Sequence, residues 1–374
     1  MPTEPAGQPI SEPISESTDD PYEDHEPMRV LAAMSGGVDS SVAALLLQRQ
    51  GHEVVSVFMR NGVAGKSAQE KSCCSASDAR DAALVAGRLG MAFYAVDYAT
   101  EFAALMDHFA AEYRRGRTPN PCVLCNQHLK FGHLLSLADD VGADAVATGH
   151  YARVVDGELR TARDANKDQT YYLFGIERAA LRRTLFPLGE LTKPEVRAIA
   201  TEAGLVTADK PESMEICFVT SGDYRDVVRA RGGSGQPGRF VAADGRELGR
   251  HDGVDGFTVG QRKGLPALGV PHYVAAIDPT SGDVTLVPRD GVEKRVMFVD
   301  GLRWLCDAPA DGAAVAVRVK VRARHEPAAA VVRADGARAR VEFAAPVAAI
   351  TPGQAAVFYD GERVLGGGWI DGSN

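Results

Sequence analysis

The sequence predicts an α/β domain built on a parallel, doubly wound sheet, followed by a region rich in short strands. Apolar segments of strand length alternate with amphipathic segments of helix length from residue 28 to about residue 222. A glycine-rich turn joins the first strand to the first helix. Beyond residue 222, glycine, proline and short β-prone runs replace the helical periodicity. Because ligands of doubly wound sheets bind at the carboxyl ends of the strands, we expect the site there.

The individual elements follow from apolar periodicity and from glycines that end helices. We expect strands over residues 28–34, 53–59, 92–96 and 143–148, the last ending at Gly149. We expect helices over residues 39–50, 77–89 and 101–115, with Ser77 as the cap of the second. Gly51, Gly90 and Gly116 follow these helices, as C-terminal glycines commonly do.

The glycine-rich turn reads Met34-Ser35-Gly36-Gly37-Val38-Asp39-Ser40-Ser41. Its glycines let backbone N–H groups approach an anion, and the helix N-terminus and the serine hydroxyls add further attraction. This is the chemistry of a phosphate cradle, although the spacing and lysine of the Walker type are absent. The alternative is an ordinary glycine-containing turn. The pattern SGGxDS resembles the pyrophosphate loop of ATP-pyrophosphatases, enzymes that split ATP into AMP and pyrophosphate.

The charge is distributed unevenly along the chain. The net charge is −9, but residues 1–28 alone contain eight acidic residues and no lysine or arginine. The remainder holds 41 basic and 42 acidic residues and is close to neutral. The acidic segment is also rich in proline and serine, so we expect a disordered tail. The low pI therefore does not exclude a nucleic-acid partner.

The composition is that of an ordinary globular protein. No stretch approaches the 18 or so continuous apolar residues that a membrane span needs. The first residues lack a basic segment followed by an apolar core, so secretion is not indicated. Six cysteines in 374 residues are too sparse for a disulfide scaffold. We therefore expect a cytoplasmic, reducing compartment.

A CxxC pair stands at the start of a helical pattern that runs to about residue 140. Asn120 is a plausible N-cap and Pro121 fits the first helical position. Cys122 and Cys125 then lie in the first turn, where the helix dipole lowers the pKa of a thiol. A metal-ligand pair or a thioredoxin-like couple is the alternative, but no second CxxC and no HxxxH completes a metal site.

The other cysteines carry weaker signals. Cys217 lies in an apolar run after a Lys-Pro turn, where a cysteine is ordinarily a small buried hydrophobic residue. Cys73, Cys74 and Cys306 are interpreted as structural or incidental.

A basic strand near the C-terminus points to an anionic partner. Alternation places four valines on one face and four cations on the other: Val315, Val317, Val319 and Val321 against Arg318, Lys320, Arg322 and Arg324. A half-buried strand with a solvated polar face would ordinarily mix charge signs, so the row of cations favours contact with a phosphate backbone. The loop Gly260-Gln-Arg-Lys-Gly264 is a solvated turn or a second phosphate contact.

Four sets of residues together resemble one family, the tRNA-specific 2-thiouridylases. They read SGGVDSSV at 35–42, TPNPCVLCN at 118–126, TGHYAR at 148–153 with KDQTYYL at 167–173, and ESMEICFV at 212–219. The resemblance covers the chain after the acidic tail. It implies an ATP-pyrophosphatase-type catalytic domain over residues 28–222, a small central domain over 223–297 and a tRNA-contacting β-barrel over 298–374, with a disordered tail over 1–27.

The resemblance also implies a reaction and its participants. The 2-oxygen of the anticodon wobble uridine would be replaced by sulfur, with ATP and Mg²⁺ as cofactors. The tRNA partners would be the lysine, glutamate and glutamine acceptors, and a cysteine desulfurase or a sulfur-relay protein would donate the sulfur.

Site residues are carried over by their matching positions. The resemblance implies an ATP site made of Ala33, Met34, Ser35, Gly36, Gly37, Val38, Asp39, Ser40, Met59 and Gly149, with Asp39 also catalytic. Cys217 would carry the persulfide, and Cys125 would be the nucleophile, with a transient Cys125–Cys217 disulfide. The tRNA contacts would be Asn120, Pro121, Cys122, Lys167, Asp168, Gln169, Arg322 and Ala323. Cys122 stands where the family often has aspartate, and Ala323 where it commonly has an aromatic residue.

Two other functional classes share the phosphate loop. One is a GMP-synthetase-like or argininosuccinate-synthase-like transferase, which attacks with ammonia or an amine and needs no cysteine pair. The other is a nucleotide-binding sensor without catalysis.

Overall fold

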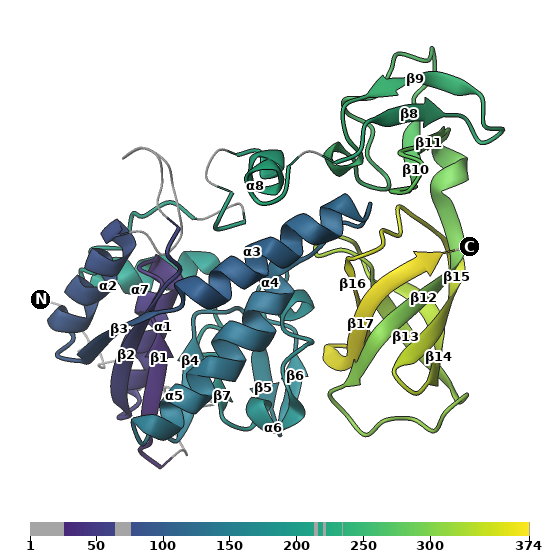
Figure 1. The fold of residues 1–374 in the computed structure, drawn as a ribbon. Coiled ribbons are helices and arrows are strands. Elements are labelled where there is room, and N and C mark those ends of the chain that lie inside the picture. Colours follow the sequence, from purple (N-terminus) through teal and green to yellow (C-terminus); the bar gives the residue numbers. More distant parts are fainter. Residues whose placement is uncertain (1–25, 64–75, 213–215, 220–221, 234, 374) are drawn as a thin grey trace, which may run out of the picture.

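The computed structural model describes residues 26–63, 76–212, 216–219, 222–233 and 235–373 (Figure 1). Most of the expected acidic tail, together with Cys73 and Cys74, lies outside the described residues. Figure 1 shows the parallel sheet and its helices at one end of the molecule, in purple to teal. The central domain, in green, and the barrel, in green to yellow, lie at the other end.

The first domain is a five-stranded sheet in the order β3-β2-β1-β4-β7, and every neighbouring pair in it is parallel. Its strands are β1 (Arg29–Ala33), β2 (Glu53–Arg60), β3 (Ala92–Asp97), β4 (Ala145–Thr148) and β7 (Thr184–Leu185). The helices of this part of the chain are α1 (Val38–Arg49), α2 (Ala76–Arg88), α3 (Ala99–Arg114), α4 (Pro121–Leu124), α5 (Leu134–Asp140), α6 (Arg178–Leu181) and α7 (Lys193–Glu202), with η1 (Cys125–His133) and η2 (Thr170–Tyr172).

Strand β1 separates two hydrophobic cores. Leu31 packs on one face with Phe102 and Phe109 of α3. Val30 and Ala32 point to the opposite face and pack in a cluster shared with α1, α2 and α7. Successive side chains of a strand point to opposite faces, so a strand buried on both sides is apolar throughout. The doubly wound α/β prediction is confirmed.

The expected elements match the structure except at their ends. The four expected strands and three expected helices are present, shifted by at most two residues. The expected cap is wrong, because α2 begins at Ala76 and Ser77 therefore lies inside the helix. The helix that was expected to run to about residue 140 is α4, η1 and α5 in succession, and its middle section is π-helical. Sections of π-helix are found mostly at functional sites.

The central domain is a four-stranded sheet in the order β10-β11-β8-β9. Its elements are α8 (Tyr224–Ala230), β8 (Gly238–Val241), β9 (Glu247–His251), η3 (Val254–Gly256), β10 (Tyr273–Ile277), β11 (Val284–Val287) and η4 (Arg289–Val292). Phe240, Val254, Val274, Val284 and Leu286 form its core. The predicted small domain is present.

The C-terminal domain is a closed six-stranded barrel. Its strands follow the order β12-β15-β14-β13-β16-β17, and pairing of β12 with β17 closes the sheet. They are β12 (Glu293–Trp304), β13 (Ala314–Lys320), β14 (Ala328–Asp335), β15 (Arg338–Ala348), β16 (Ala355–Asp360) and β17 (Arg363–Ser373). The alternation predicted for the basic strand is confirmed up to Lys320, where β13 ends, and Val317 and Val319 are buried in the barrel core. Arg322 and Arg324 lie beyond the strand, so that end of the prediction is wrong. The β-barrel prediction is confirmed.

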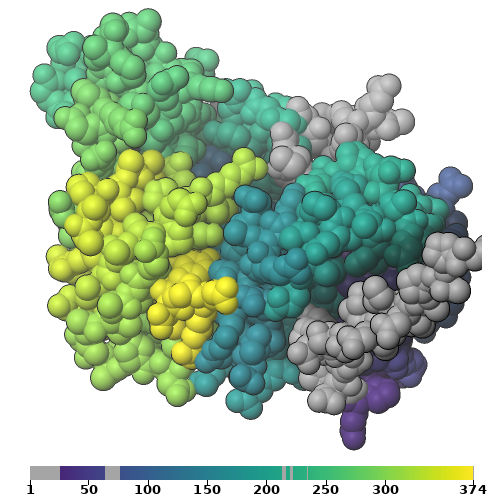
Figure 2. All heavy atoms as spheres, turned by 180° about the vertical axis from the view of Figure 1, so that it is seen from behind, coloured from purple at the N-terminus to yellow at the C-terminus, as the bar shows by residue number. Residues whose placement is uncertain are grey.

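A hairpin of the first domain joins the barrel sheet. Strands β5 (Arg153–Val155) and β6 (Glu158–Arg160) form it, and Arg160 pairs with Arg363 of β17. Arg153 also makes an ion pair of 2.8 Å with Glu362. Figure 2 shows the barrel, in yellow and light green, packed against the teal and blue atoms of the first domain. Within the described residues, no helix has the length and apolar character that crossing a membrane requires.

Candidate active site

The phosphate loop lies where β1 passes into α1. Gly37 precedes the helix in an extended conformation, and no side chain caps the first helical turn. The N–H groups of that turn have no intrahelical acceptor, so they are available to an anion. Gly36 has φ +74°, and a Cβ atom there would lie 2.2 Å from the carbonyl oxygen of Asp78. Only glycine fits this position.

Serine hydroxyls fix the shape of the loop from within. The backbone N–H of Ser35 donates to Oγ of Ser40 over 3.0 Å, and the two hydroxyl oxygens lie 3.1 Å apart. The hydroxyls of Ser40 and Ser41 donate to the carbonyl of Gly37 over 3.1 Å and 2.9 Å. These bonds hold the loop in one conformation before any anion arrives.

Gly149 brings the neighbouring strand end against the same loop. It follows β4, which pairs with β1 on the side opposite β2. A Cβ atom at Gly149 would lie 2.6 Å from the backbone nitrogen of Ser40. The order of the sheet reverses between β1 and β4, and such a switch point is the usual ligand crevice of doubly wound folds. Met59, near the end of β2, is buried in the hydrophobic core.

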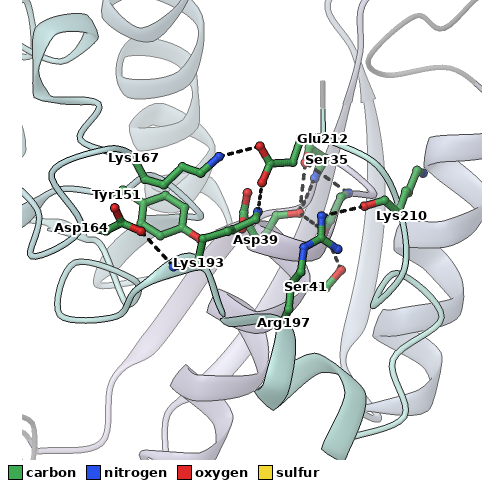
Figure 3. Close-up of polar contacts among 12 residues, drawn as sticks. Ser35, Asp39, Ser41, Tyr151, Asp164, Lys167, Lys193, Arg197, Lys210 and Glu212 are labelled. Atoms are coloured by element: carbon green, nitrogen blue, oxygen red, sulfur yellow. Dashed lines mark hydrogen bonds and ion pairs between the residues drawn. The ribbon is translucent and has the colours of Figure 1, made fainter. Parts of the chain in front are cut away.

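A row of charged side chains begins at Asp39 and continues through Lys193 and Glu212 to Lys167 (Figure 3). Oδ1 of Asp39 accepts hydrogen bonds from Tyr151 Oη over 2.9 Å and from Lys193 Nζ over 2.5 Å. Lys193 also lies 3.1 Å from Glu212, which Lys167 contacts over 2.6 Å. The hydrogen bond from Lys167 and the charge of Lys193 hold the pKa of Glu212 below its ordinary value, although burial opposes them. Burial and the charge of Asp39 raise the pKa of Tyr151.

A second lysine holds the loop from the side of α2. Lys210 Nζ donates to the carbonyl of Gly36 over 2.9 Å and contacts Asp78 and Asp81 over 2.7 Å and 2.5 Å. Burial alone would lower the pKa of Lys210, but the hydrogen bonds to Asp78 and Asp81 outweigh it, so the pKa lies above its ordinary value. The lysine is therefore protonated at neutral pH.

Sequence reasoning missed both lysines, together with Tyr151 and Glu212. A local signal existed for Lys193, because Thr192 and Glu195 form a capping box that places it at the start of α7. Lys210 belongs to the Lys-Pro turn before the Cys217 segment. Neither local signal indicates that the side chains of Lys193 and Lys210 reach the phosphate loop, which lies 154 and 174 positions earlier in the chain.

The loop is suited to a magnesium-bound nucleoside triphosphate. The uncapped helix start, the serines and the two lysines suit phosphate oxygens. Within the described ranges, no group of three or more His, Cys, Asp and Glu side chains is arranged to hold a metal. Mg²⁺ is commonly bound through one or two carboxylates together with substrate phosphates. Asp39, which also pairs with Lys193, is the carboxylate in the loop that would take this role.

The CxxC helix begins as predicted. The side chain of Asn120 accepts a hydrogen bond from the backbone N–H of Val123 over 3.4 Å, and Pro121 occupies the first helical position. Cys122 is exposed, whereas Cys125 is partly buried. The predicted lowering of the Cys125 pKa is wrong, because burial raises it and the charge of Lys130 only partly opposes this. In this conformation Cys125 is a thiol at neutral pH.

The raised pKa of Cys125 makes a prediction for its alkylation by iodoacetamide. Because the thiolate is the reactive form, the rate should keep rising with pH beyond about 8.5, the pKa of an ordinary thiol. Peptide mass spectrometry across a pH series measures this. Lys130→Met should move the midpoint further up, since Lys130 lowers the pKa. A midpoint at or below that of an ordinary thiol contradicts the prediction.

Cys217 and Cys125 pack against the same hydrophobic cluster, each partly buried. Phe218, next to Cys217, contacts Phe109 of α3 edge to face, with ring centroids 5.1 Å apart. Val123, between the two CxxC cysteines, is buried in the same cluster. The two cysteine segments therefore border one hydrophobic cluster, while the Cys125–Cys217 pairing itself stays a prediction.

The other residues predicted to contact tRNA have partners within the protein. Lys167 pairs with Glu212, and the side chain of Asp168 is only 4% exposed and lies 3.5 Å from Lys320. Gln169 accepts a hydrogen bond from the backbone N–H of Tyr151 over 2.9 Å. Arg322 donates to the carbonyl of Val259 over 2.7 Å and also contacts Thr351. Contact of these residues with tRNA stays a prediction.

The basic segment at residues 318–324 presents fewer exposed cations than the sequence indicates. Arg318 and Arg324 are exposed, whereas Lys320 and Arg322 are partly buried. Lys320 lies over the ring of Tyr359, 5.6 Å from its centroid. Ala323 is partly buried against the large core of the first domain.

Comparison with known proteins gives matches along nearly the whole chain. Three family models match, described as the tRNA methyl transferase HUP domain over residues 28–221, the tRNA methyl transferase PRC-barrel domain over 225–288 and the aminomethyltransferase beta-barrel domain over 294–370. The chain is 44% identical to the tRNA-specific 2-thiouridylase MnmA of Rhodopirellula baltica, over 91% of this chain and 96% of that protein. It is 46% identical to the proteins of the same name from Maricaulis maris, over 91% and 87%, and from Geotalea uraniireducens, over 92% and 95%.

Proposed function

Because this chain belongs to the family of tRNA-specific 2-thiouridylases, we propose that it replaces the 2-oxygen of the wobble uridine in tRNA anticodons by sulfur. The reaction consumes ATP and releases AMP and pyrophosphate. The observation that carries the proposal is the chain of contacts from Asp39 through Lys193 to Glu212, which joins the phosphate loop to the segment leading to Cys217. Relatives named for this activity support it over nine-tenths of the chain.

The phosphate loop would perform the activation. A uracil 2-oxygen is a poor leaving group, so it attacks the α-phosphate of ATP and forms an adenylated uridine while pyrophosphate departs. The first-turn N–H groups of α1, Ser35 and Ser40 would bind the departing pyrophosphate, because no side chain caps this turn and both serines belong to the loop. Mg²⁺ beside Asp39 would spread the developing negative charge.

The cysteines would perform the sulfur transfer. The terminal sulfur of a Cys217 persulfide attacks C2 of the adenylated uridine, and AMP leaves. The deprotonated Cys125 then attacks Sγ of Cys217, which breaks the bond between Sγ and the transferred sulfur, releases 2-thiouridine and forms a Cys125–Cys217 disulfide. Alternatively, Cys125 first cleaves the persulfide and free hydrosulfide attacks C2. Both routes end in the same disulfide, which an external thiol must reduce before the next turnover.

The partners follow from the same proposal. The target uridine must leave the anticodon stack to reach the cysteines. Asn120, Pro121 and Cys122 would face this base, since they begin the helix that carries Cys125. The tRNA substrates would be the lysine, glutamate and glutamine acceptors, and a cysteine desulfurase or a sulfur-relay protein would load Cys217.

The test is a reconstituted reaction. The protein is incubated with ATP, Mg²⁺, a cysteine desulfurase with cysteine, and unmodified tRNA, and nucleosides and nucleotides are then quantified. We expect 2-thiouridine and AMP in equal amounts. AMP formation with ammonia as the nitrogen source and no thiolation would instead indicate an amide or amine transferase. Nucleotide binding without turnover would indicate a sensor.

The salt dependence of tRNA binding should distinguish the exposed Arg324 from the partly buried Arg322. Arg324→Ala should weaken binding at low salt and reduce the slope of log K against log salt by about 1, because one phosphate contact is lost. Arg322→Ala should reduce the slope by less, since its guanidinium also bonds to Val259 and Thr351. Filter binding across a salt series measures both. A reduced slope in Arg322→Ala alone would contradict this assignment.

A further inference from the structure

The barrel contacts the first domain directly in front of the CxxC helix. The turn before β16, Pro352-Gly353-Gln354, lies against residues 117–119, which lead into Asn120 and α4. The amide of Gln354 donates to the carbonyl of Thr118 over 3.0 Å and to that of Pro119 over 3.3 Å. In the opposite direction, the backbone N–H of Thr118 donates to the carbonyl of Pro352 over 2.8 Å.

Gly353 lets the two backbones approach closely. It has φ +89°, and a Cβ atom there would lie 2.9 Å from the carbonyl oxygen of Thr118. Arg117 adds a contact on the same side, donating to the carbonyl of Ile370 over 3.2 Å and pairing with Asp371 over 3.0 Å. Three successive residues before the helix are therefore held by barrel groups.

The turn is itself fixed by the rest of the barrel and by the central domain. The backbone N–H of Ile370 donates to the carbonyl of Gln354 over 2.8 Å, and that of Gly353 donates to the carbonyl of Ile370 over 2.9 Å. Thr351, just before the turn, donates to the carbonyl of Val259 over 3.2 Å. The hydroxyl of Thr118 donates to that of Thr258 over 3.2 Å. A single point therefore joins all three domains.

The same part of the barrel also supports the segment at 167–173. The hydroxyl of Tyr171 donates to the carbonyl of Ala355 over 3.0 Å, and Tyr171 also hydrogen-bonds the side chain of Asn120. Asn120 in turn caps α4. The N-cap that starts the cysteine helix is thus held from two directions by groups anchored on β16.

We propose that Gln354 is a positioning residue for sulfur transfer, acting through residues 118–120 on Cys122 and Cys125. The two hydrogen bonds donated by the side-chain amide of Gln354 fix the backbone that enters α4. The position of the first turn of α4 decides where Cys125 lies relative to Cys217 and the target base. The barrel then does more than bind substrate: it completes the sulfur half of the site. The role of Gln354 in sulfur transfer rests on the proposed function, whereas the effect of Gln354 on the reactivity of Cys125 does not.

The experiment compares Gln354→Ala with Glu362→Gln in the full-length chain. The control weakens the ion pair of Glu362 with Arg153, which also joins the barrel to the first domain, but it does not touch residues 117–120. Three readouts are compared. Pyrophosphate release and 2-thiouridine formation are measured in a single turnover with tRNA, and the alkylation of Cys125 is measured across a pH series. Gly353→Ala is a second variant, in which the loop must shift away from Thr118.

We expect Gln354→Ala to slow 2-thiouridine formation at least about tenfold while pyrophosphate release changes little, because a small misplacement of a reacting group is costly. The midpoint of Cys125 alkylation should shift as well, and Glu362→Gln should change neither. An equal fall in pyrophosphate release and thiolation, or an unchanged alkylation profile in both turn variants, would overturn the proposal. If the wild type makes no 2-thiouridine, the proposed function fails, and the alkylation profiles still decide whether Gln354 positions Cys125.

Discussion

Replacing Cys217 with serine should abolish 2-thiouridine formation while ATP-dependent pyrophosphate release continues. The serine hydroxyl cannot carry a persulfide, so the activated uridine has no sulfur to accept. The loss should be on the order of a thousandfold or more, as for removal of a catalytic nucleophile. The phosphate loop is joined to this segment through Asp39, Lys193 and Glu212, none of which the substitution alters. Single-turnover assays of pyrophosphate and 2-thiouridine separate the two steps.

The matching variant Cys125→Ser should differ from Cys217→Ser in the sulfur that the protein itself carries. Cys217 should still be loaded, and its persulfide should accumulate because nothing resolves it. Mass spectrometry of the intact chain detects the added sulfur. Cys306→Ser is the control, since Cys306 is also partly buried but contacts the carbonyl of Leu365 in the barrel. Full thiolation by Cys217→Ser would show that Cys217 is not the sulfur carrier.

Replacing Asp39 with asparagine should suppress the first step instead. Asparagine can still accept from Tyr151 and Lys193, so the shape of the site is retained while its negative charge is lost. Lys193, whose side chain is only 10% exposed, then keeps Glu212 as its carboxylate partner. Pyrophosphate release should fall on the order of a hundredfold, since a charged group next to the departing phosphates is removed.

The control for Asp39→Asn is the same substitution in an ion pair outside the site. Asp283 pairs with Arg239 in the central domain over 2.9 Å, so Asp283→Asn removes one paired carboxylate without touching the loop. Its activity should match the wild type. Normal pyrophosphate release by Asp39→Asn, with thiolation reduced, would place Asp39 in the sulfur half of the site rather than the ATP half.

Local patterns were sufficient for much of the fold. Continuous apolar segments identified β1, β2 and β4, which are buried on both faces, and glycines after amphipathic segments located the helix ends. The start of α4 was predictable because capping depends on adjacent residues, here Asn120, Pro121 and Val123. The alternation of valines and cations identified β13 for the same reason. The cap at Ser77 was wrongly predicted, since serine is also tolerated inside a helix.

The properties that failed prediction depend on groups far away in sequence. The dipole argument for Cys125 considered its own helix, whereas the surrounding core raises the pKa of the thiol. The four cations at residues 318–324 look alike in sequence, but Lys320 and Arg322 are partly buried and contact Asp168, Val259 and Thr351. Lys193 gave no sign of its contact with Asp39, which lies 154 positions earlier.

The sequence by itself determined the phosphate loop, the cysteine helix and the succession of an α/β domain and β-rich domains, because each depends on neighbours within a few residues. Only the tertiary structure decided what faces these elements. It placed Lys193 and Lys210 on either side of the loop, brought the Cys125 and Cys217 segments to one core, and set the barrel turn at Gln354 against Thr118. Such contacts depend on the packing of distant elements, and no local pattern records which ones will meet.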